Sequence, residues 1–378
     1  MAARRQKEVD MTSPYDKQVA RMQRRLASGE FSLEGTPGYR AGEKADLSET
    51  FDYADLYPTI WGRECGSAGI GKLREVAITN ITEHESASVY SEDPKFFHAF
   101  GNYPSLDIAK MQDQTDGYEG ALEEAGVQVT RIDFPDPPVS AFGPMMYMYA
   151  ARELLILRGG SIVPKMGWNP FSIGRAEFLA KWALEELSVP ILLTITGDVV
   201  CEPGPCLFLA EDVFVAAHSI AFTEAGLDQL YSLVRRTQRN DDMTFLTLRG
   251  GGAHLYFDPQ SGGSAHPDML IGPLDVDKVL LYPGAIDFET WNWLKGRDYE
   301  IVEVEHDEQV QFAPANIITL EPGRVIMHQE AKKAVAAVRA AGVDVVEVPF
   351  SEYFNAGGGL HCATMEVLRD VGPFSTDR

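Results

Sequence analysis

The hydrophobic and polar positions of this chain repeat along most of its length. After residue 68, two apolar runs separated by a turn, a stretch with helical spacing and a further apolar run recur about five times. Gly and Pro mark the boundaries, and the hydrophobic period changes from 2 to 3.6 within each unit. This pattern predicts a strand–strand–helix–strand (ββαβ) unit.

The last unit is the clearest, because Pro322-Gly323 predicts a hairpin turn and Gly342 predicts the end of a helix. The first unit is expected to hold a strand at 73–79, a helix at 118–125 and a strand at 127–132. Each later unit is expected to hold two strands, a helix and a third strand, in this order: 153–157, 161–164, 175–187 and 190–196; 206–209, 213–216, 227–236 and 243–248; 268–271, 278–281, 288–294 and 299–304; and 317–320, 325–327, 331–341 and 343–348. Closing such units into a ring removes exposed sheet edges, and a strand after Cys362 can close it by pairing with the first unit. An ordinary mixed α/β sheet is the alternative that periodicity leaves open.

Residues 1–67 lack the repeat, and we expect an N-terminal extension with a helix that begins at Ser13-Pro14 and an irregular arm; residues 68–378 form the second predicted domain. No apolar segment follows the first arginines, no run reaches the ~20 apolar residues of a bilayer span, and four cysteines are too few for a disulfide scaffold. A net charge of −23 argues against nucleic-acid and membrane partners, although solubility alone also explains it. The expectation is a cytoplasmic protein.

Cys362 is the candidate nucleophile, because it follows Gly357-Gly358-Gly359, whose backbone can approach a ligand closely. A nucleophilic thiol needs a base. His266 stands two residues before Asp268, and in an extended segment both side chains would point to one side. His254 also follows glycines and is the rival, whereas His361 would face away from Cys362 on a strand.

Glu153 and Glu202 each begin an apolar run. Each carboxylate can belong to a functional site or can simply be a solvated residue at the end of a strand. Cys201 and Cys206 have no second pair at zinc-ligand spacing, and no glycine-rich nucleotide motif is present. We therefore expect no metal and no organic cofactor.

Four motifs in order resemble the guanidino-group-modifying superfamily of amidinotransferases, arginine deiminases and dimethylargininases. They are Ala151-Arg152-Glu153-Leu154, Glu202-Pro203-Gly204-Pro205, His266-Pro267-Asp268 and Gly357-Gly358-Gly359-Leu360-His361-Cys362, and residues 164–183 are similar to the arginine-bearing segment of the amidinotransferases. The resemblance implies the pentein fold, an α/β propeller of five ββαβ blades, over roughly residues 68–372.

Carried over to this chain, the resemblance implies Cys362 as nucleophile, His266 as acid/base, Glu202 as the partner that orients His266, and Glu153 and Asp268 as carboxylates that hold a guanidinium. The superfamily usually has Asp where this chain has Glu153. Members of the superfamily are often dimers, and a dimer is expected here. One pentein binds the ribosome and catalyses no reaction. The negative net charge and the five retained polar residues argue against such a binding function for this chain.

The substrate is expected to be a small guanidine-like cation. In amidinotransferases a basic residue soon after the His-x-Asp strand binds an amino-acid carboxylate, and residues 282–287 contain no Arg or Lys. This favours a hydrolase that releases ammonia from guanylurea through an amidino-thioether on Cys362. An amidinotransferase that moves the amidino group of arginine to an amine is the alternative.

Overall fold

The structure, a computed structural model, describes residues 14–29, 39–44, 53–82, 106–133, 139–140, 143–144, 148–167, 173–249 and 257–377. Within these ranges lie five three-stranded sheets and one two-stranded ribbon. In every three-stranded sheet the first strand is antiparallel to the middle strand, and the middle strand is parallel to the strand that follows the helix. This is the predicted ββαβ order in an α/β fold.

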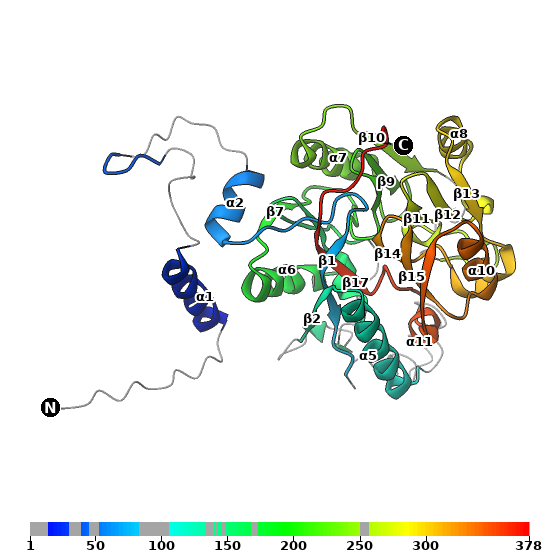
Figure 1. Ribbon diagram of the computed structural model, residues 1–378, viewed down its shortest axis with the longest axis horizontal. Coiled ribbons are helices and arrows are strands. Elements are labelled where there is room, and N and C mark those ends of the chain that lie inside the picture. Colours follow the sequence, from blue (N-terminus) through cyan, green and yellow to red (C-terminus); the bar gives the residue numbers. More distant parts are fainter. Residues whose placement is uncertain are drawn as a thin grey trace.

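The strands, sheet by sheet, are β17 (Thr364–Arg369), β1 (Leu73–Thr79) and β2 (Gln128–Ile132); β5 (Leu155–Leu157), β6 (Gly160–Val163) and β7 (Ile191–Thr194); β8 (Leu207–Ala210), β9 (Val213–Ala217) and β10 (Thr244–Leu248); β11 (Ile271–Asp275), β12 (Lys278–Leu281) and β13 (Glu300–Glu303); and β14 (Ile318–Glu321), β15 (Arg324–His328) and β16 (Asp344–Val348). The helices that join the second and third strands are α5 (Ile108–Glu124), α6 (Arg175–Leu187), α7 (Glu224–Gln238), α8 (Phe288–Gly296) and α10 (Lys332–Ala340). These helices lie at the outside of the body and the strands inside it (Figure 1).

The remaining described elements are short or lie outside the repeat. They are α1 (Pro14–Ser28), α2 (Tyr53–Trp61), α9 (His306–Phe312), α11 (Ser351–Asn355), the ribbon β3 (Val139–Ser140) and β4 (Gly143–Pro144), and the 3₁₀ helices η2 (Ala150–Glu153), η3 (Pro267–Met269) and η4 (Pro283–Ala285). None of the helices in the described ranges has the length and apolar character that crossing a bilayer requires.

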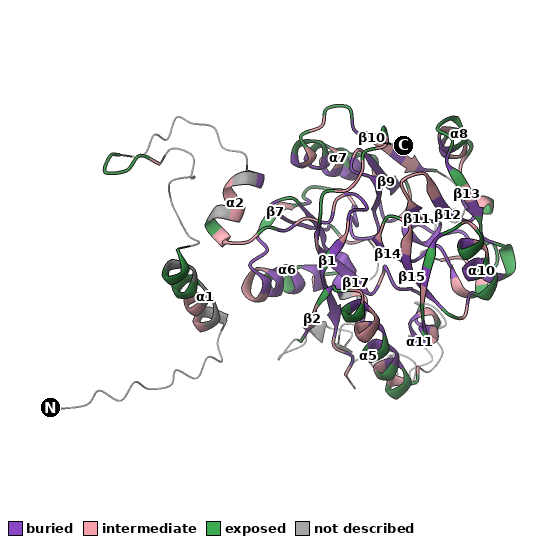
Figure 2. Ribbon diagram, viewed as in Figure 1, coloured by how far each residue is buried: buried purple, intermediate pink, exposed green. Residues whose placement is uncertain are grey.

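The burial of the elements follows from their sequence patterns. Every residue of β8 is buried, and β9 is buried along its whole length as well, as expected for strands covered on both faces. Helix α7 buries only one face, including Leu227, Leu230 and Val234 at helical spacing, and Thr223 caps its N-terminus by accepting from Gly226 N. Figure 2 shows the same contrast between buried inner strands and partly exposed outer helices.

The two ends of the repeat meet in one sheet. Strand β17, near the C-terminus, pairs antiparallel with β1, with Val76 opposite Glu366, as the sequence predicted. Contacts between neighbouring sheets join β17 to β5, β8 to β11, β11 to β14 and β14 to β1. The first strands of the five units therefore lie toward one another.

Residues before position 68 also contact the body. Arg63 forms an ion pair with Glu75 of β1 at 2.6 Å, and Gly66 forms a β-bridge with Leu368 of β17. The expected N-terminal helix is α1, which contacts α6. The domain boundary at residue 67 stays a prediction.

Two predicted strands are wrong at their starts. The strand expected at 153–157 begins only at Leu155, and Glu153 lies in the 3₁₀ helix η2. The sequence predicted a strand at 268–271, but β11 begins at Ile271 and residues Pro267–Met269 form the 3₁₀ helix η3. Pro267 fits the first position of a helical turn because its φ is fixed and it has no N–H to leave unpaired. His266 and Asp268 therefore do not share one face of an extended strand.

Candidate active site

Each of the five sheets presents a polar side chain at most five residues before its first strand. They are Glu153 before β5, Glu202 before β8, Asp268 before β11, Asn316 before β14 and Cys362 before β17. Since the first strands of the five units lie toward one another, their N-terminal ends gather residues that are far apart in the sequence. The repeat thus supplies one candidate functional residue per sheet.

Cys362 lies in a turn that leads into β17 and is half-buried. Its Sγ lies 3.5 Å from Oδ2 of Asp268 and 3.1 Å from Nδ2 of Asn316. Burial, and after it the negative charge of Asp268, raise the pKa of the Cys362 thiol well above its usual value, against hydrogen bonds from the Gly359 backbone and from Asn316. The thiol therefore needs an additional positive charge to ionise near neutral pH.

The glycines before Cys362 have identifiable structural reasons. Gly357 has φ = +95°, a conformation that other residues rarely adopt. A Cβ on Gly358 would lie 2.8 Å from the ring of Tyr149, and one on Gly359 would lie 2.6 Å from Oδ1 of Asn316. Glycine thus lets the Cys362 segment pack directly against Asn316.

Asp268 is buried, and its Oδ2 accepts a hydrogen bond from Nδ1 of His361 at 2.8 Å. Burial opposes ionisation, but this hydrogen bond and the charges of His361, His266 and Arg152 lower the pKa of Asp268. Burial, followed by the charge of Arg152, lowers the pKa of His361. Nδ1 of His361 thus donates to an ionised Asp268, whose Oδ1 has no hydrogen-bond partner in the described part of the chain.

His266 and Glu202 form a second pair. Nε2 of His266 lies 3.1 Å from Oε2 of Glu202, whose Oε1 accepts from the backbone N–H of Gly167 at 2.9 Å. Burial alone would lower the pKa of His266, but the hydrogen bond and the charge of Glu202 outweigh it and raise that pKa. With a side chain that is 22% exposed, His266 can exchange protons with a ligand or with water.

Glu153 ends η2 and is paired with Arg175, the first residue of α6. Nε of Arg175 lies 2.6 Å from Oε1 of Glu153, and Nη2 contacts the same oxygen. Burial raises the pKa of Glu153, and the charge and hydrogen bonds of Arg175 oppose that shift. Oε2 of Glu153 is buried and has no hydrogen-bond partner among the described residues, so one of its two oxygens is unsatisfied.

A close backbone contact joins the Glu153 and Glu202 segments. A Cβ on Gly204 would lie 1.5 Å from the carbonyl oxygen of Arg152. On the neighbouring Arg152 side chain, Nη2 donates to the carbonyl of Cys206 at 2.9 Å. A side chain at position 204 would therefore force the two carboxylate-bearing segments apart.

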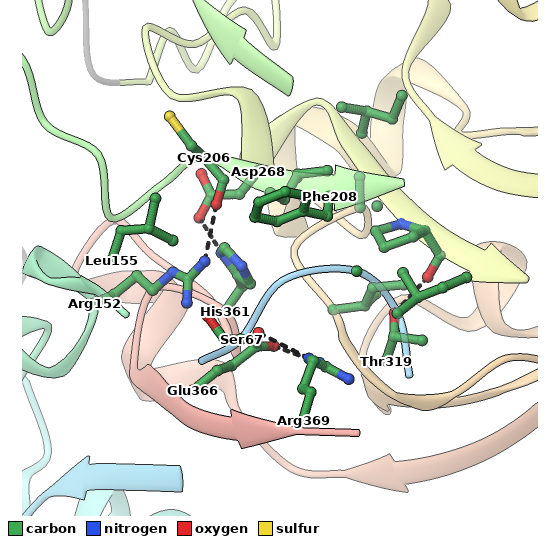
Figure 3. Close-up of a pocket in the computed structure, with 18 residues that line it drawn as sticks. Ser67, Arg152, Leu155, Cys206, Phe208, Asp268, Thr319, His361, Glu366 and Arg369 are labelled. Atoms are coloured by element: carbon green, nitrogen blue, oxygen red, sulfur yellow. Dashed lines mark hydrogen bonds and ion pairs between the residues drawn. The ribbon is translucent and has the colours of Figure 1, made fainter. Parts of the chain in front are cut away.

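A small cavity of about 20 Å³, room for roughly one water molecule, lies among the first strands. Leu155, Phe208, Ile271, Thr319 and Glu366 line it, one from each first strand. Figure 3 shows Arg152, Asp268 and His361 directed toward one another beside this cavity, and Glu366 paired with Arg369. Burial opposes ionisation, but the charge and hydrogen bonds of Arg369 lower the pKa of Glu366 to about 2.

The structure places the five predicted residues in three groups. Cys362 meets Asp268, His266 meets Glu202, and Glu153 meets Arg175. The functional roles of these residues stay predictions. The rival His254 lies outside the described residues.

Two side chains at the thiol were misjudged or missed in the sequence. His361 was expected on a strand, facing away from Cys362, but both precede β17 and both reach Oδ2 of Asp268, because the chain turns there. Asn316 was missed; the available signal was its position directly before a buried apolar strand, the position of Glu153 in its own unit. No group of three His, Cys, Asp or Glu side chains in the described ranges is arranged to hold a metal ion.

The chain is similar to several known proteins. Residues 260–369 match the family described as arginine deiminase. The chain is 35% identical over 361 residues, 92% of its length and 95% of the relative's, to the 2-nitroimidazole nitrohydrolase of Mycobacterium sp. (strain JS330). Among solved structures it resembles SxtG, an amidinotransferase from Microseira wollei (TM-score 0.62, 15% identity, 82% of this chain and 99% of that one), and a dimethylarginine dimethylaminohydrolase from Pseudomonas aeruginosa complexed with citrulline (TM-score 0.58, 17% identity, 78% and 99%).

The chain therefore belongs to the guanidino-group-modifying superfamily, and its α/β fold matches the pentein structures of that superfamily. It is an enzyme, a hydrolase that acts on C–N bonds of amidine-type groups.

Proposed function

We propose that the chain hydrolyses a C–N bond on a planar carbon that carries three nitrogen atoms, through a covalent intermediate on Cys362, and that guanylurea is its substrate. The observation that carries this proposal is the ionised Asp268 carboxylate, 3.5 Å from Sγ of Cys362, with Oδ1 unpartnered among the described residues. A protonated guanidine group offers forked N–H donors to such an oxygen, which would hold its central carbon beside the sulfur.

The raised pKa of Cys362 also favours a cation as substrate. Within the described contacts, Sγ meets the Asp268 carboxylate, the Met269 sulfur and the Asn316 amide, none of which is positively charged. A cationic group bound at Asp268 would compensate that carboxylate and lower the pKa of the thiol. A cationic substrate would thus help to form the nucleophile that attacks it.

The residues present can carry both halves of the reaction. The sulfur of Cys362 forms a bond to the guanidine carbon, His266 donates a proton to the terminal nitrogen, the C–N bond breaks and ammonia leaves. Water then gives a proton to His266, its oxygen bonds to the same carbon, and the C–S bond breaks to restore the thiolate. In this scheme Glu202 holds His266, and Glu153 and Asp268 bind the substrate. Guanylurea and water give biuret and ammonia.

A second candidate substrate is a 2-nitroimidazole. Its C2 also carries three nitrogen atoms, and attack by Cys362 would release nitrite instead of ammonia. Two observations favour it: the 35% identity to a nitrohydrolase over 92% of this chain, and the Arg175 guanidinium that already compensates Glu153. Since Arg175 already compensates one of the two carboxylates, a neutral planar ring is an alternative to a cation.

The five sheets are, in this proposal, the blades of a closed five-bladed propeller. The contacts between β17 and β5, β8 and β11, β11 and β14, and β14 and β1 support closure, as does the cavity lined by all five first strands. Closure would fix the five strand starts relative to one another, which catalysis by residues from five separate sheets requires.

The test is turnover by the purified full-length chain, with Cys362→Ala as its matched control. Ammonia is measured with guanylurea, nitrite with 2-nitroimidazole, and ornithine with arginine plus an amine acceptor. We expect ammonia release from guanylurea without any acceptor, and a loss of at least about 10⁴-fold in Cys362→Ala. Mass spectrometry of the Cys362 peptide after a substrate pulse should detect the trapped group.

The outcomes separate the candidates. Nitrite release with a much higher kcat/KM than ammonia release would replace guanylurea by the nitroimidazole. Ornithine formation that depends on the acceptor and exceeds both would overturn the hydrolase. Turnover that survives in Cys362→Ala would remove Cys362 from the mechanism.

A further inference from the structure

Asn316 lies between the two segments that carry the candidate nucleophile and its carboxylate. It stands two residues before β14 and is only 1% exposed. Its Oδ1 accepts from the backbone N–H groups of His361 at 2.8 Å and Cys362 at 3.3 Å. Its Nδ2 lies 3.1 Å from Sγ of Cys362 and 3.3 Å from the carbonyl oxygen of Asp268.

The orientation of this amide follows from its partners. Only the amide oxygen of Asn316 can accept hydrogen bonds from two backbone N–H groups, and the carbonyl oxygen of Asp268 needs a donor, which the NH₂ group supplies. The reverse orientation would put the NH₂ group against two N–H donors and the amide oxygen against the carbonyl of Asp268. The NH₂ group must therefore face the Cys362 sulfur.

We propose that Asn316 is a catalytic residue, whose amide N–H stabilises the negative charge on the Cys362 sulfur while its oxygen fixes the backbone of the Cys362 turn. Hydrogen bonds to a charged form favour that form, and they are roughly twice as strong as bonds between neutral groups. Within the described contacts of Sγ, the Asp268 carboxylate opposes this charge and the Met269 sulfur is neutral. Donors to the sulfur are the Asn316 amide and the Gly359 backbone N–H.

The same N–H acts at both ends of the reaction. It stabilises the thiolate before the attack, and it stabilises the sulfur again when the C–S bond breaks and the electron pair returns to it. This inference rests on Cys362 as the nucleophile of the proposed function. It does not depend on which substrate the enzyme takes.

The test measures the thiolate directly, without substrate. The rate at which iodoacetamide alkylates Cys362 is followed against pH by peptide mass spectrometry; Cys65, Cys201 and Cys206 are buried and are distinguished by their peptides. The variants are Asn316→Ser, which replaces the amide donor by a shorter hydroxyl without adding charge, and Asn316→Asp, which keeps an acceptor for the backbone. Circular dichroism and thermal melting report folding.

The matched control is Gln114→Glu. The buried Gln114 amide also accepts a backbone N–H, that of Glu352, and donates to a side chain, Ser351, but it does not contact the thiol. We expect the midpoint of alkylation to rise by about one pH unit in Asn316→Ser, a tenfold lower thiolate fraction, and further in Asn316→Asp. The Gln114→Glu midpoint should equal that of the wild type.

The inference is overturned if Asn316→Ser, folded, keeps the wild-type midpoint, whether or not Asn316→Asp shifts it. If Asn316→Ser does not fold, Asn316→Asp with an unchanged midpoint overturns it. A shifted midpoint in an enzyme that turns over none of the three substrates would support this inference and reject the proposed function. Turnover that requires Cys362 with no shift in either variant would do the reverse.

Discussion

The two carboxylates expected to share one task, Asp268 and Glu153, lie in opposite electrostatic settings. Asp268 accepts from His361, contacts the thiol and retains an unpartnered oxygen among the described residues. Glu153 is paired through Oε1 with the guanidinium of Arg175. Among the described residues, Asp268 thus has no Arg or Lys in direct contact, whereas Glu153 already has one.

This difference shows that two carboxylates at equivalent strand starts can differ in whether a neighbouring cation compensates their charge. Asp268 concentrates negative charge beside Cys362, which opposes ionisation of the thiol and favours binding of a cation. Arg175 presents to Glu153 the same chemical group that a guanidine substrate would present. Glu153 can therefore act through its second oxygen, or serve to anchor α6 against η2.

Among changes to the two carboxylates, the largest expected effect comes from Asp268→Asn. Turnover should fall on the order of 10³-fold, because the charge that binds and orients the substrate is lost. The same change should lower the pKa of Cys362, since the charge of Asp268 raises it. We therefore expect faster alkylation of Cys362 at neutral pH in an enzyme that has become nearly inactive.

Asp277→Asn, in the turn between β11 and β12, is the control for Asp268→Asn, because it removes an acid from the same unit at a half-exposed position. If Asp268→Asn lowers the alkylation rate of Cys362 as much as it lowers turnover, the substitution has displaced the segment around position 268 and has not merely removed a charge. Unchanged turnover would remove Asp268 from the site.

Variants of the Glu153–Arg175 pair distinguish a Glu153 that binds substrate from a Glu153 that binds only Arg175. Both side chains of the pair are less than a tenth exposed, so Glu153→Gln or Arg175→Gln should each destabilise the fold by about 3–5 kcal/mol, and the double variant by less than the sum. If Oε2 of Glu153 also holds the substrate, Glu153→Gln should raise KM by about tenfold. Denaturant unfolding and steady-state kinetics measure the two effects separately.

An unchanged KM in Glu153→Gln would leave Asp268 as the carboxylate that binds substrate and would strengthen the contrast between the two. Arg175→Gln separates the roles further. It frees Glu153 from its cation, and it should lower KM for guanylurea more than for the neutral 2-nitroimidazole.

The repeat was predictable because each unit has its own apolar pattern, as the agreement at residues 73–79, 175–187 and 278–281 illustrates. The strand after Cys362 and its pairing with β1 were predictable because an open sheet edge needs a partner. The start of β11 was missed because Pro267 favours a helical turn that apolar periodicity does not report.

The partners of the site residues depend on tertiary contacts that no local pattern encodes. The pairing of Arg175 with Glu153 requires α6 to begin beside η2, and the approach of His361 to Asp268 requires a turn where a strand was expected. Asn316 gave a weaker signal than a thiol, a histidine or a carboxylate, because an Asn before a strand is also typical of a turn. Comparing the five strand starts with one another would have found it.

The smallest expected effect concerns the pair formed by His266 and Glu202. Because Glu202 raises the pKa of His266, Glu202→Gln should lower it and move the corresponding limb of the kcat/KM profile to lower pH by about one unit. A group whose folded pKa is raised stabilises the fold below its unfolded pKa and loses that contribution as pH rises through the folded pKa. Glu202→Gln should therefore lower the melting temperature more at about pH 5.5 than at about pH 9. If the limb of the kcat/KM profile stays in place in Glu202→Gln but moves in Asp268→Asn, His266 is not the group that carries the proton. That role would then belong to a group in contact with Asp268.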